Sequence, residues 1–359
     1  MRTYRGIAAL LATWTLAALA LGGCATEQKL PEAPPIIDPR GAQSMGDMEK
    51  AISVLQEASH HANAGVRANV MEAVQPLKDE RAVAVLEAGI REHSTSGDVT
   101  TDPWVVRFAA VMTAGKRMET SLRPLIQQLF PDEINDNVRV AMVYALKRMG
   151  DDSHMNLLMR SLSSTNPDVR ANTAMVLGLL GDPSAIAVLR QDRGDPDWRV
   201  KFEIKAAMAR LGDDEAVHAI VAMALSSVVE EQWNSLQLCG DLPQEIATST
   251  LKIGLRPNWK LEDTPYAQNL RRNLIAARGL GKKGINEEGK SGRWVMIFLN
   301  ADDPTLRDEP ALRALAALAL GDILKPGQQA PLVPLLNDQN PQVRVAAAAA
   351  IVNMLSKPR

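Results

Sequence analysis

Cysteine, aromatic residues and a surplus of charge of one sign are all lacking in this sequence of 359 residues. Two cysteines exclude a disulfide-stapled scaffold and any metal site built from several cysteines. Aromatic residues make up 4% of the chain, so aliphatic side chains and the 15 methionines must fill the core, which suits closely packed helices. Lys and Arg (40) nearly balance Asp and Glu (42), which leaves no strong global field to attract nucleic acid. The composition therefore indicates a weakly acidic, all-helical protein.

The first 24 residues follow the pattern of a bacterial export signal. Two arginines precede an uncharged apolar stretch that ends in Leu-Gly-Gly-Cys at Cys24. This ending resembles the lipobox of bacterial lipoproteins, in which the cysteine is acylated and becomes the first residue of the mature chain. The resemblance implies a signal peptide over residues 1–23, lipid on Cys24 and, from Ala25, sorting to the outer membrane facing the periplasm. Because residues 6–23 are 18 uncharged positions, a plain membrane anchor or ordinary secretion remains an alternative.

Residues 24–46 contain four prolines and show no helical periodicity. Proline fixes the backbone in an extended form and removes hydrogen-bond donors. We therefore expect a stiff tether between Cys24 and the rest of the chain.

The remaining residues, 47–359, repeat about every 31 positions. Gly-Asp pairs begin at Gly150, Gly181 and Gly212, and a basic residue lies 11 positions before each glycine. A helix start is expected where Asn or Asp precedes proline, as in Asn166-Pro167, Asp195-Pro196, Asp303-Pro304 and Asn340-Pro341. A helix stop is expected at each Gly-Asp pair. One such helix pair cannot bury its apolar side alone, so neighbouring units must stack.

The expected helices carry buried stripes at helical spacing: Val169, Thr173, Leu177 and Leu180 in one unit, and Val138, Met142, Leu146 and Met149 in the unit before it. The repeat resembles HEAT repeats, specifically the short-unit variety also found in phycobilisome lyases, over roughly residues 50–355. That resemblance implies an all-α fold, a right-handed α-solenoid of stacked helix pairs in which the second helix of each pair lines the concave face.

The repeat signature is lost over residues 213–265, a stretch that holds Trp233, Cys239 and Trp259. Loops and departures from a repeat often carry function, since they need not maintain stacking. A neutral, diverged repeat is equally consistent with the sequence.

The sequence contains little that could support catalysis. The five histidines have no metal-binding spacing, and the adjacent His60 and His61 would point about 100° apart on a helix. Cys239 has no disulfide partner beyond Cys24 and is expected to be a buried structural residue. We therefore predict no catalytic residue, no cofactor and no metal site. Some relatives by resemblance are bilin lyases, but the expected export separates this chain from that pigment machinery.

An arginine recurs at one position of the repeat, at Arg67, Arg107, Arg139, Arg170, Arg313 and Arg344. A row of arginines could form an anion-binding ladder. Pairing of each guanidinium with acids between repeats is the favoured interpretation, because ordered repeats need ties between units.

The concave surface is the predicted binding face. If the stripes above are core, outward-facing triples follow: Asn69, Glu72, Pro76; Ala109, Met112, Lys116; Ala141, Tyr144, Arg148; Asn172, Met175, Leu179; and Glu203, Ala206, Arg210. Met and Tyr are adaptable residues enriched at interfaces. We therefore predict a partner-binding groove centred on Met112, Tyr144 and Met175 and edged by Lys116, Arg148 and Arg210. The alternative is that these side chains pack against adjacent helices.

Taken together, these patterns predict a lipid-anchored scaffold of the bacterial cell envelope that binds a protein or peptide partner, contacts the membrane through Cys24 and does not bind nucleic acid. Two alternatives stay open. One is an enzyme or cofactor-carrying protein that uses residues 213–265, and the other is a passive structural spacer.

Overall fold

The chain divides into two compact units, Met1–Leu30 and Pro31–Arg359. In the computed structural model, the described residues are 31–92, 103–191, 194–255, 266–286, 289–299 and 309–357. The expected signal peptide, Cys24 and Trp259 lie outside them. The description below concerns the second unit.

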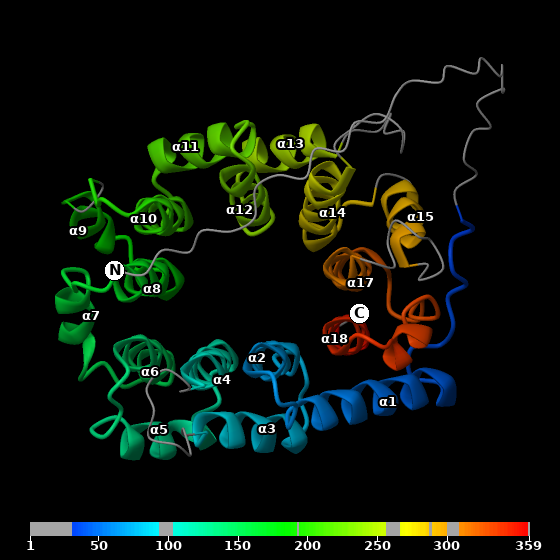
Figure 1. Ribbon diagram of the computed structural model, residues 1–359, viewed down its shortest axis with the longest axis horizontal. Coiled ribbons are helices and arrows are strands. Elements are labelled where there is room, and N and C mark those ends of the chain that lie inside the picture. Colours follow the sequence, from blue (N-terminus) through cyan, green and yellow to red (C-terminus); the bar gives the residue numbers. More distant parts are fainter. Residues whose placement is uncertain are drawn as a thin grey trace, which may run out of the picture. The chain divides into compact units, whose positions relative to one another are not determined.

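The described residues form helices and no strands, which confirms the all-α prediction (Figure 1). One layer of helices lies on the outside: α1 (Ala42–Ala58), α3 (Glu80–Ile90), α5 (Arg123–Leu129), α7 (Met155–Ser161), α9 (Ala185–Gln191), α11 (Asp214–Ala224), α13 (Glu245–Gly254) and α15 (Lys290–Val295). The inner layer is formed by α2 (Ala64–Ala73), α4 (Trp104–Arg117), α6 (Asp136–Arg148), α8 (Pro167–Leu180), α10 (Trp198–Arg210), α12 (Val229–Cys239), α14 (Tyr266–Lys282), α17 (Pro310–Ile323) and α18 (Pro341–Ser356). Short 3-10 helices η1 (Thr120–Leu122), η3 (Met296–Leu299) and η4 (Val333–Asn337) complete the series. Stacked helix pairs of this kind are an α-solenoid.

The repeat correctly predicts where α8 and α18 begin and where α6, α8 and α10 end. Asn135, Asn166 and Asn340 each cap a helix by accepting the N–H two residues further on, at 2.9–3.0 Å. Glycines at the Gly-Asp pairs take positive φ angles, +89° at Gly150, +76° at Gly181 and +89° at Gly212, which allows the chain to leave the helix. These glycines therefore end α6, α8 and α10 as predicted.

One expected helix start is wrong. The sequence pointed to Asp195-Pro196, but the cap of α10 is Asp197, whose side chain accepts from the Arg199 N–H at 2.8 Å. Asp195 instead accepts from the Asp197 N–H at 2.8 Å and pairs with Arg170. The Asp195 carboxylate therefore pairs with Arg170 of the preceding repeat and does not cap α10. The Asp303-Pro304 start lies outside the described residues.

At four of its six positions, the recurrent arginine ties one repeat to the next, whereas Arg139 pairs with Asp136 of its own helix and Arg344 donates to the Asp338 and Gln339 carbonyls. Arg107 bonds Glu133 at 2.9 Å, Arg170 bonds Asp195 at 2.6 Å and Arg313 bonds Asp338 at 2.7 Å. In each case the acid lies 25 or 26 residues after the arginine, two residues before the cap of the next inner helix, and it also accepts the N–H of that cap residue. Arg67 and Glu92 repeat the same pairing. The pairing interpretation of the arginines is confirmed at these four positions.

Glycine eight residues past the arginine sets the spacing between consecutive inner helices. A Cβ built on Gly115 would lie 2.8 Å from the Ala145 Cα, one on Gly178 2.6 Å from the Ala207 Cα, and one on Gly321 2.7 Å from the Ala350 Cα. These distances leave no room for a side chain. The backbones of α4 and α6, α8 and α10, and α17 and α18 therefore touch at these glycines.

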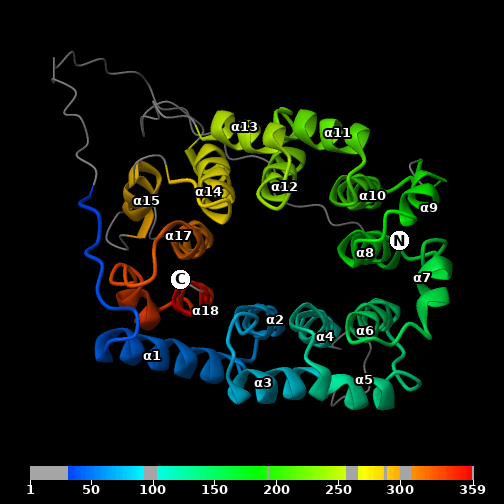
Figure 2. The same cartoon turned by 180° about the vertical axis from the view of Figure 1, so that it is seen from behind.

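The inner layer closes on itself within this unit. The last helix, α18, packs against α1 and α2, as both views show (Figures 1 and 2). The Ile37 N–H donates to the Gly327 carbonyl at 3.0 Å, and the Gln329 side chain donates to Ser44 Oγ at 3.1 Å and Asp47 Oδ2 at 3.2 Å. Residues from Pro34 onward, expected to be part of the tether, therefore dock on the last repeat, and α1 already begins at Ala42.

The stretch 213–265 continues the helical series in its described part. Asp213 caps α11 through the Ala216 N–H at 2.9 Å, and α12 and α13 follow. Up to Leu255, the departure from the repeat is therefore in the sequence and not in the secondary structure.

Candidate partner-binding face

Two cavities are lined by side chains of the inner helices. The first, of about 550 Å³, lies among α2, α4, α14, α17 and α18. Its lining combines aliphatic side chains of α17 and α18 with three cations and two carboxylates: Lys116, Arg278, Lys282, Glu72 and Asp322. Arg278 bonds Asp322 at 2.9 Å. The balance of charge in this cavity is positive.

The second cavity, of about 590 Å³, lies among α8, α10, α12 and the start of α4. Its charged lining consists of three carboxylates and two arginines: Asp168, Glu203, Asp241, Arg199 and Arg210. Three aromatic side chains, Trp104, Trp198 and Phe202, complete the wall together with the amides of Asn172, Asn234 and Gln237. Asp241, the carboxylate in excess here, pairs with Lys282 of the first cavity at 2.7 Å.

The predicted outward triples have the right helical register. Six of their ten first and third members line the cavities: Asn69, Pro76 and Lys116 the first, and Asn172, Glu203 and Arg210 the second. Ala109 and Ala141 are buried, and Arg148 and Leu179 line neither cavity. Of the six predicted partner-binding residues, the structure therefore places Lys116 and Arg210 in cavities, although in two different ones.

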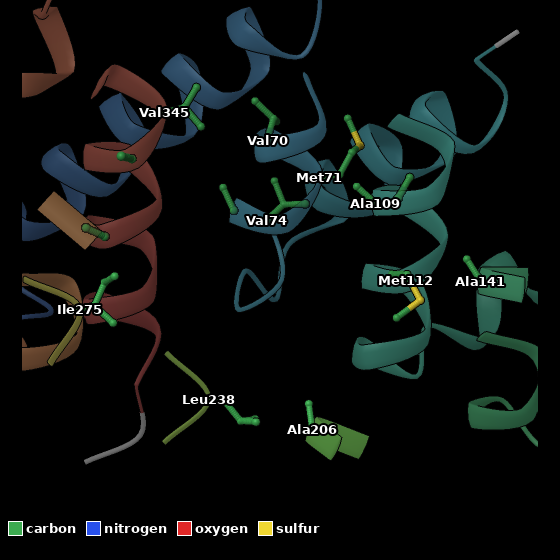
Figure 3. Close-up of a cluster of buried hydrophobic side chains, with 14 of the residues drawn as sticks. Val70, Met71, Val74, Ala109, Met112, Ala141, Ala206, Leu238, Ile275 and Val345 are labelled. Atoms are coloured by element: carbon green, nitrogen blue, oxygen red, sulfur yellow. The ribbon is translucent and has the colours of Figure 1, made fainter. Parts of the chain in front are cut away.

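Three middle members of the triples, Met112, Tyr144 and Ala206, are buried, and this corrects the predicted groove centre, whereas Glu72 lines the first cavity. Tyr144 is 3% exposed and Met112 4% exposed. The Tyr144 ring lies against Gly115, where a Cβ would come within 2.8 Å of its Cε1 atom, and burial raises the pKa of its phenol. Met112 and Ala206 belong to the buried cluster of Figure 3. Consecutive inner helices approach so closely that this column fills the seam between them.

Met175 and Arg148 are half-buried and line neither cavity. Met175 packs against the hydrophobic core, and Arg148 lies near enough to Tyr144 to offset part of the rise in the pKa of that phenol. The structure thus does not bring the six predicted residues together in one groove.

The sequence interpretation missed two tryptophans that open helices. Trp104 and Trp198 are the first residues of α4 and α10, and Trp198 is 49% exposed. The sequence did contain a signal for them. Each tryptophan is a large aromatic residue in the first turn of its helix, and it precedes the buried apolar stripe, which begins at Val106 in α4 and at Val200 in α10. In a sequence with so few aromatic residues, that placement indicates a surface role.

Cys239 and His61, two residues considered above for chemistry, have surroundings that fit a structural role. Cys239 is fully buried, as predicted, and burial raises the pKa of its thiol to about 11. His61 Nδ1 accepts the Asn63 N–H at 3.0 Å. Across the described ranges, no group of three or more His, Cys, Asp and Glu side chains could hold a metal ion. Nor does any helix in those ranges have the length and apolar character needed to cross a membrane.

Comparison with protein families gives two matches in the same regions as the structural repeats. A family described as HEAT repeats matches residues 155–235, and one described as HEAT repeat matches residues 330–357. The first match spans α7 to α12, and the second spans η4 and α18. The chain contains HEAT repeats. A search of curated proteins gives no match to this sequence.

Two solved structures are similar to this chain over most of its length. The complex of CpcE and CpcF of phycocyanin lyase from Nostoc sp. PCC7120 has 16% identity and a TM-score of 0.43, covering 84% of this chain and 100% of that chain. Human deoxyhypusine hydroxylase in complex with glycerol has 17% identity and a TM-score of 0.33, covering 87% of this chain and 98% of that chain.

Proposed function

We propose that this HEAT-repeat protein is a lipid-anchored scaffold of the bacterial cell envelope that binds a protein or peptide partner on its inner helices without a covalent step. The observation that carries the proposal is the pair of cavities with mixed polar and apolar linings on the inner layer. Lipid on Cys24 would hold the scaffold on the outer membrane, and the motif that ends at Cys24 supports this location.

The cavities have the size and chemistry of binding sites. Pockets of about 300–1,000 Å³ with apolar walls and a few polar groups are typical of ligand sites in proteins. Here the polar groups come from several inner helices, so a partner that fills both cavities would bridge non-adjacent repeats.

Partner capture tests the binding proposal. Lys116→Glu with Arg210→Glu reverses one charge in each cavity, so crosslinking in whole cells should recover a specific partner with the wild type and lose it with this double variant. Arg160→Glu with Lys252→Glu makes the same charge change on exposed positions of α7 and α13 and should keep the partner. Equal capture by both double variants would place binding away from the inner face, and absence of any specific partner would favour a passive spacer.

Fatty-acid labelling tests the anchor. Cells fed a labelled fatty acid should yield labelled protein in the outer-membrane fraction, and Cys24→Ser should remove both the label and the membrane association. Cys239→Ser is the matched control, since this thiol is buried in α12. Label that persists in Cys24→Ser would contradict the anchor without bearing on partner binding.

A further inference from the structure

The cavity among α8, α10 and α12 contains two charged groups with unmet hydrogen-bonding needs. Glu203 and Arg210 both lie on α10 and both line this cavity. Within the described residues, the buried atoms Glu203 Oε2 and Arg210 Nη1 have no hydrogen-bond partner. A buried polar atom without a partner costs folding free energy, so the two groups are arranged for something that would satisfy them.

The other charged side chains of the cavity are already paired. Asp168 accepts from Arg199 at 2.7 Å, and Arg199 also bonds Asp197. Asp241 accepts from Lys282 at 2.7 Å. Glu203 is therefore the carboxylate of the lining with a vacant buried oxygen, and desolvation by burial raises its pKa more than the charge of Arg210 lowers it. A cation delivered next to Glu203 would counter that desolvation.

Helix geometry sets the spacing of the two residues. Glu203 and Arg210 are seven residues apart, so they share a face of α10 and their Cα atoms lie about 10 Å apart along its axis. An extended peptide rises about 3.4 Å per residue, so about three peptide residues cover that distance. One molecule could therefore donate to Glu203 and offer an oxygen to Arg210.

The aromatic and amide side chains suit the same ligand. Trp198, 49% exposed, and Trp104 present indole rings to the cavity, and indole faces attract the ammonium or guanidinium group of Lys and Arg. Asn234 and Gln237 of α12 carry both donors and acceptors, as a peptide main chain requires.

From this arrangement we propose that the cavity binds an extended segment of a partner protein, with a Lys or Arg side chain on Glu203 beside the tryptophans and, about three residues along, a carbonyl or carboxylate oxygen on Arg210. This inference rests on the proposed partner binding and names the chemistry that the second cavity recognises.

Selection from a random peptide library tests directly whether the cavity prefers peptides with a basic side chain. Peptides selected on the purified full-length protein should be enriched in Lys or Arg, with an acidic or amide residue about three positions away. A selected peptide carrying a fluorophore then serves as the probe for anisotropy. Glu203→Gln should weaken its binding about tenfold through loss of a charge-assisted hydrogen bond, and Trp198→Ala about fivefold.

Matched controls separate this inference from the proposed function. Glu230→Gln makes the same change at an exposed position of α12 outside the cavity and should leave binding unchanged, and Lys-to-norleucine substitution in the peptide should abolish the effect of Glu203→Gln. Melting temperatures must agree among the variants. Selected peptides without basic enrichment that still lose binding on Arg210→Glu would overturn this inference and leave the proposed function standing. Failure to select any peptide that responds to Lys116→Glu or Arg210→Glu would count against both.

Discussion

Gly178 of α8 and Ala207 of α10 meet backbone to backbone. A Cβ on Gly178 would lie 2.6 Å from the Ala207 Cα and 2.8 Å from its Cβ, so the contact exists only because residue 178 has no side chain. The same contact recurs at Gly115 and Gly321. The glycine of the repeat is therefore a spacing element, which positions successive cavity-lining helices.

Substitution of this glycine should destabilise the fold. Gly178→Ala forces α8 and α10 apart and should cost about 1–3 kcal/mol of unfolding free energy, the usual cost of overpacking. Gly46→Ala is the control within an exposed turn of α1, where a Cβ meets nothing within 4 Å; it should stabilise by about 0.5–1 kcal/mol. Urea denaturation gives both values. A neutral Gly178→Ala would show that the helices can separate freely.

The Arg107–Glu133 pair offers a second test, because its side chains are only 3% and 4% exposed. Arg107→Met should destabilise by about 3–5 kcal/mol, since it leaves a buried carboxylate without its partner. Adding Glu133→Leu should recover most of that loss. Arg199→Met breaks a pair that is 48% exposed on both sides and should cost less than about 1 kcal/mol. Urea denaturation gives the loss of unfolding free energy for each variant. Equal losses for Arg107→Met and Arg199→Met would show that burial does not set the cost of breaking these pairs.

Gln329 makes the buried side-chain hydrogen bonds between the two ends of the repeat domain. Gln329→Ala removes the donor to Ser44 and Asp47 and should cost about 1–3 kcal/mol, with faster amide hydrogen exchange in α1 and η4. Gln328→Ala, at the half-buried neighbour that donates to the Pro34 carbonyl, should have a smaller effect. Exchange that stays unchanged in α1 would mean that this buried contact does not hold the ends together.

Acid should weaken the start of α3. The side-chain hydrogen bond from Arg81, followed by the Arg81 N–H, lowers the pKa of Asp79 from 3.8 to about 2. A pKa below that of the unfolded chain means that the stabilisation is complete above about pH 4 and is lost as the pH falls towards 2. Asp79→Asn keeps a capping oxygen but does not titrate, so the melting temperatures of the wild type and the variant should converge between pH 6 and pH 2. A difference that is constant with pH would contradict this linkage, and Asp132→Asn, at an exposed position, is the control for the substitution itself.

The repeat could be predicted because its signals are local. A capping Asn two residues before the helical N–H that it accepts, and a glycine at a positive φ angle, act within a few residues of the chain. The register of the triples could be predicted for the same reason, and Asn172, Glu203 and Arg210 line one cavity as that register requires. The extent to which these side chains are buried could not be predicted from the sequence. The burial of Tyr144 depends on how closely α6 approaches Gly115 of α4.

The sequence by itself determined the repeated helical pairs, the ends of α6, α8 and α10 and four of the arginine ties, since spacing and capping are properties of neighbouring residues. Only the tertiary structure decided that α18 returns to α1 and α2, and that Lys116 and Arg210 line separate cavities. Ring closure results from the small rotation between successive repeats summed over the whole series, and it brings Gln329 to Ser44 across 285 residues of sequence. The total rotation cannot be inferred from a stretch of a few dozen residues, because every repeat contributes to it.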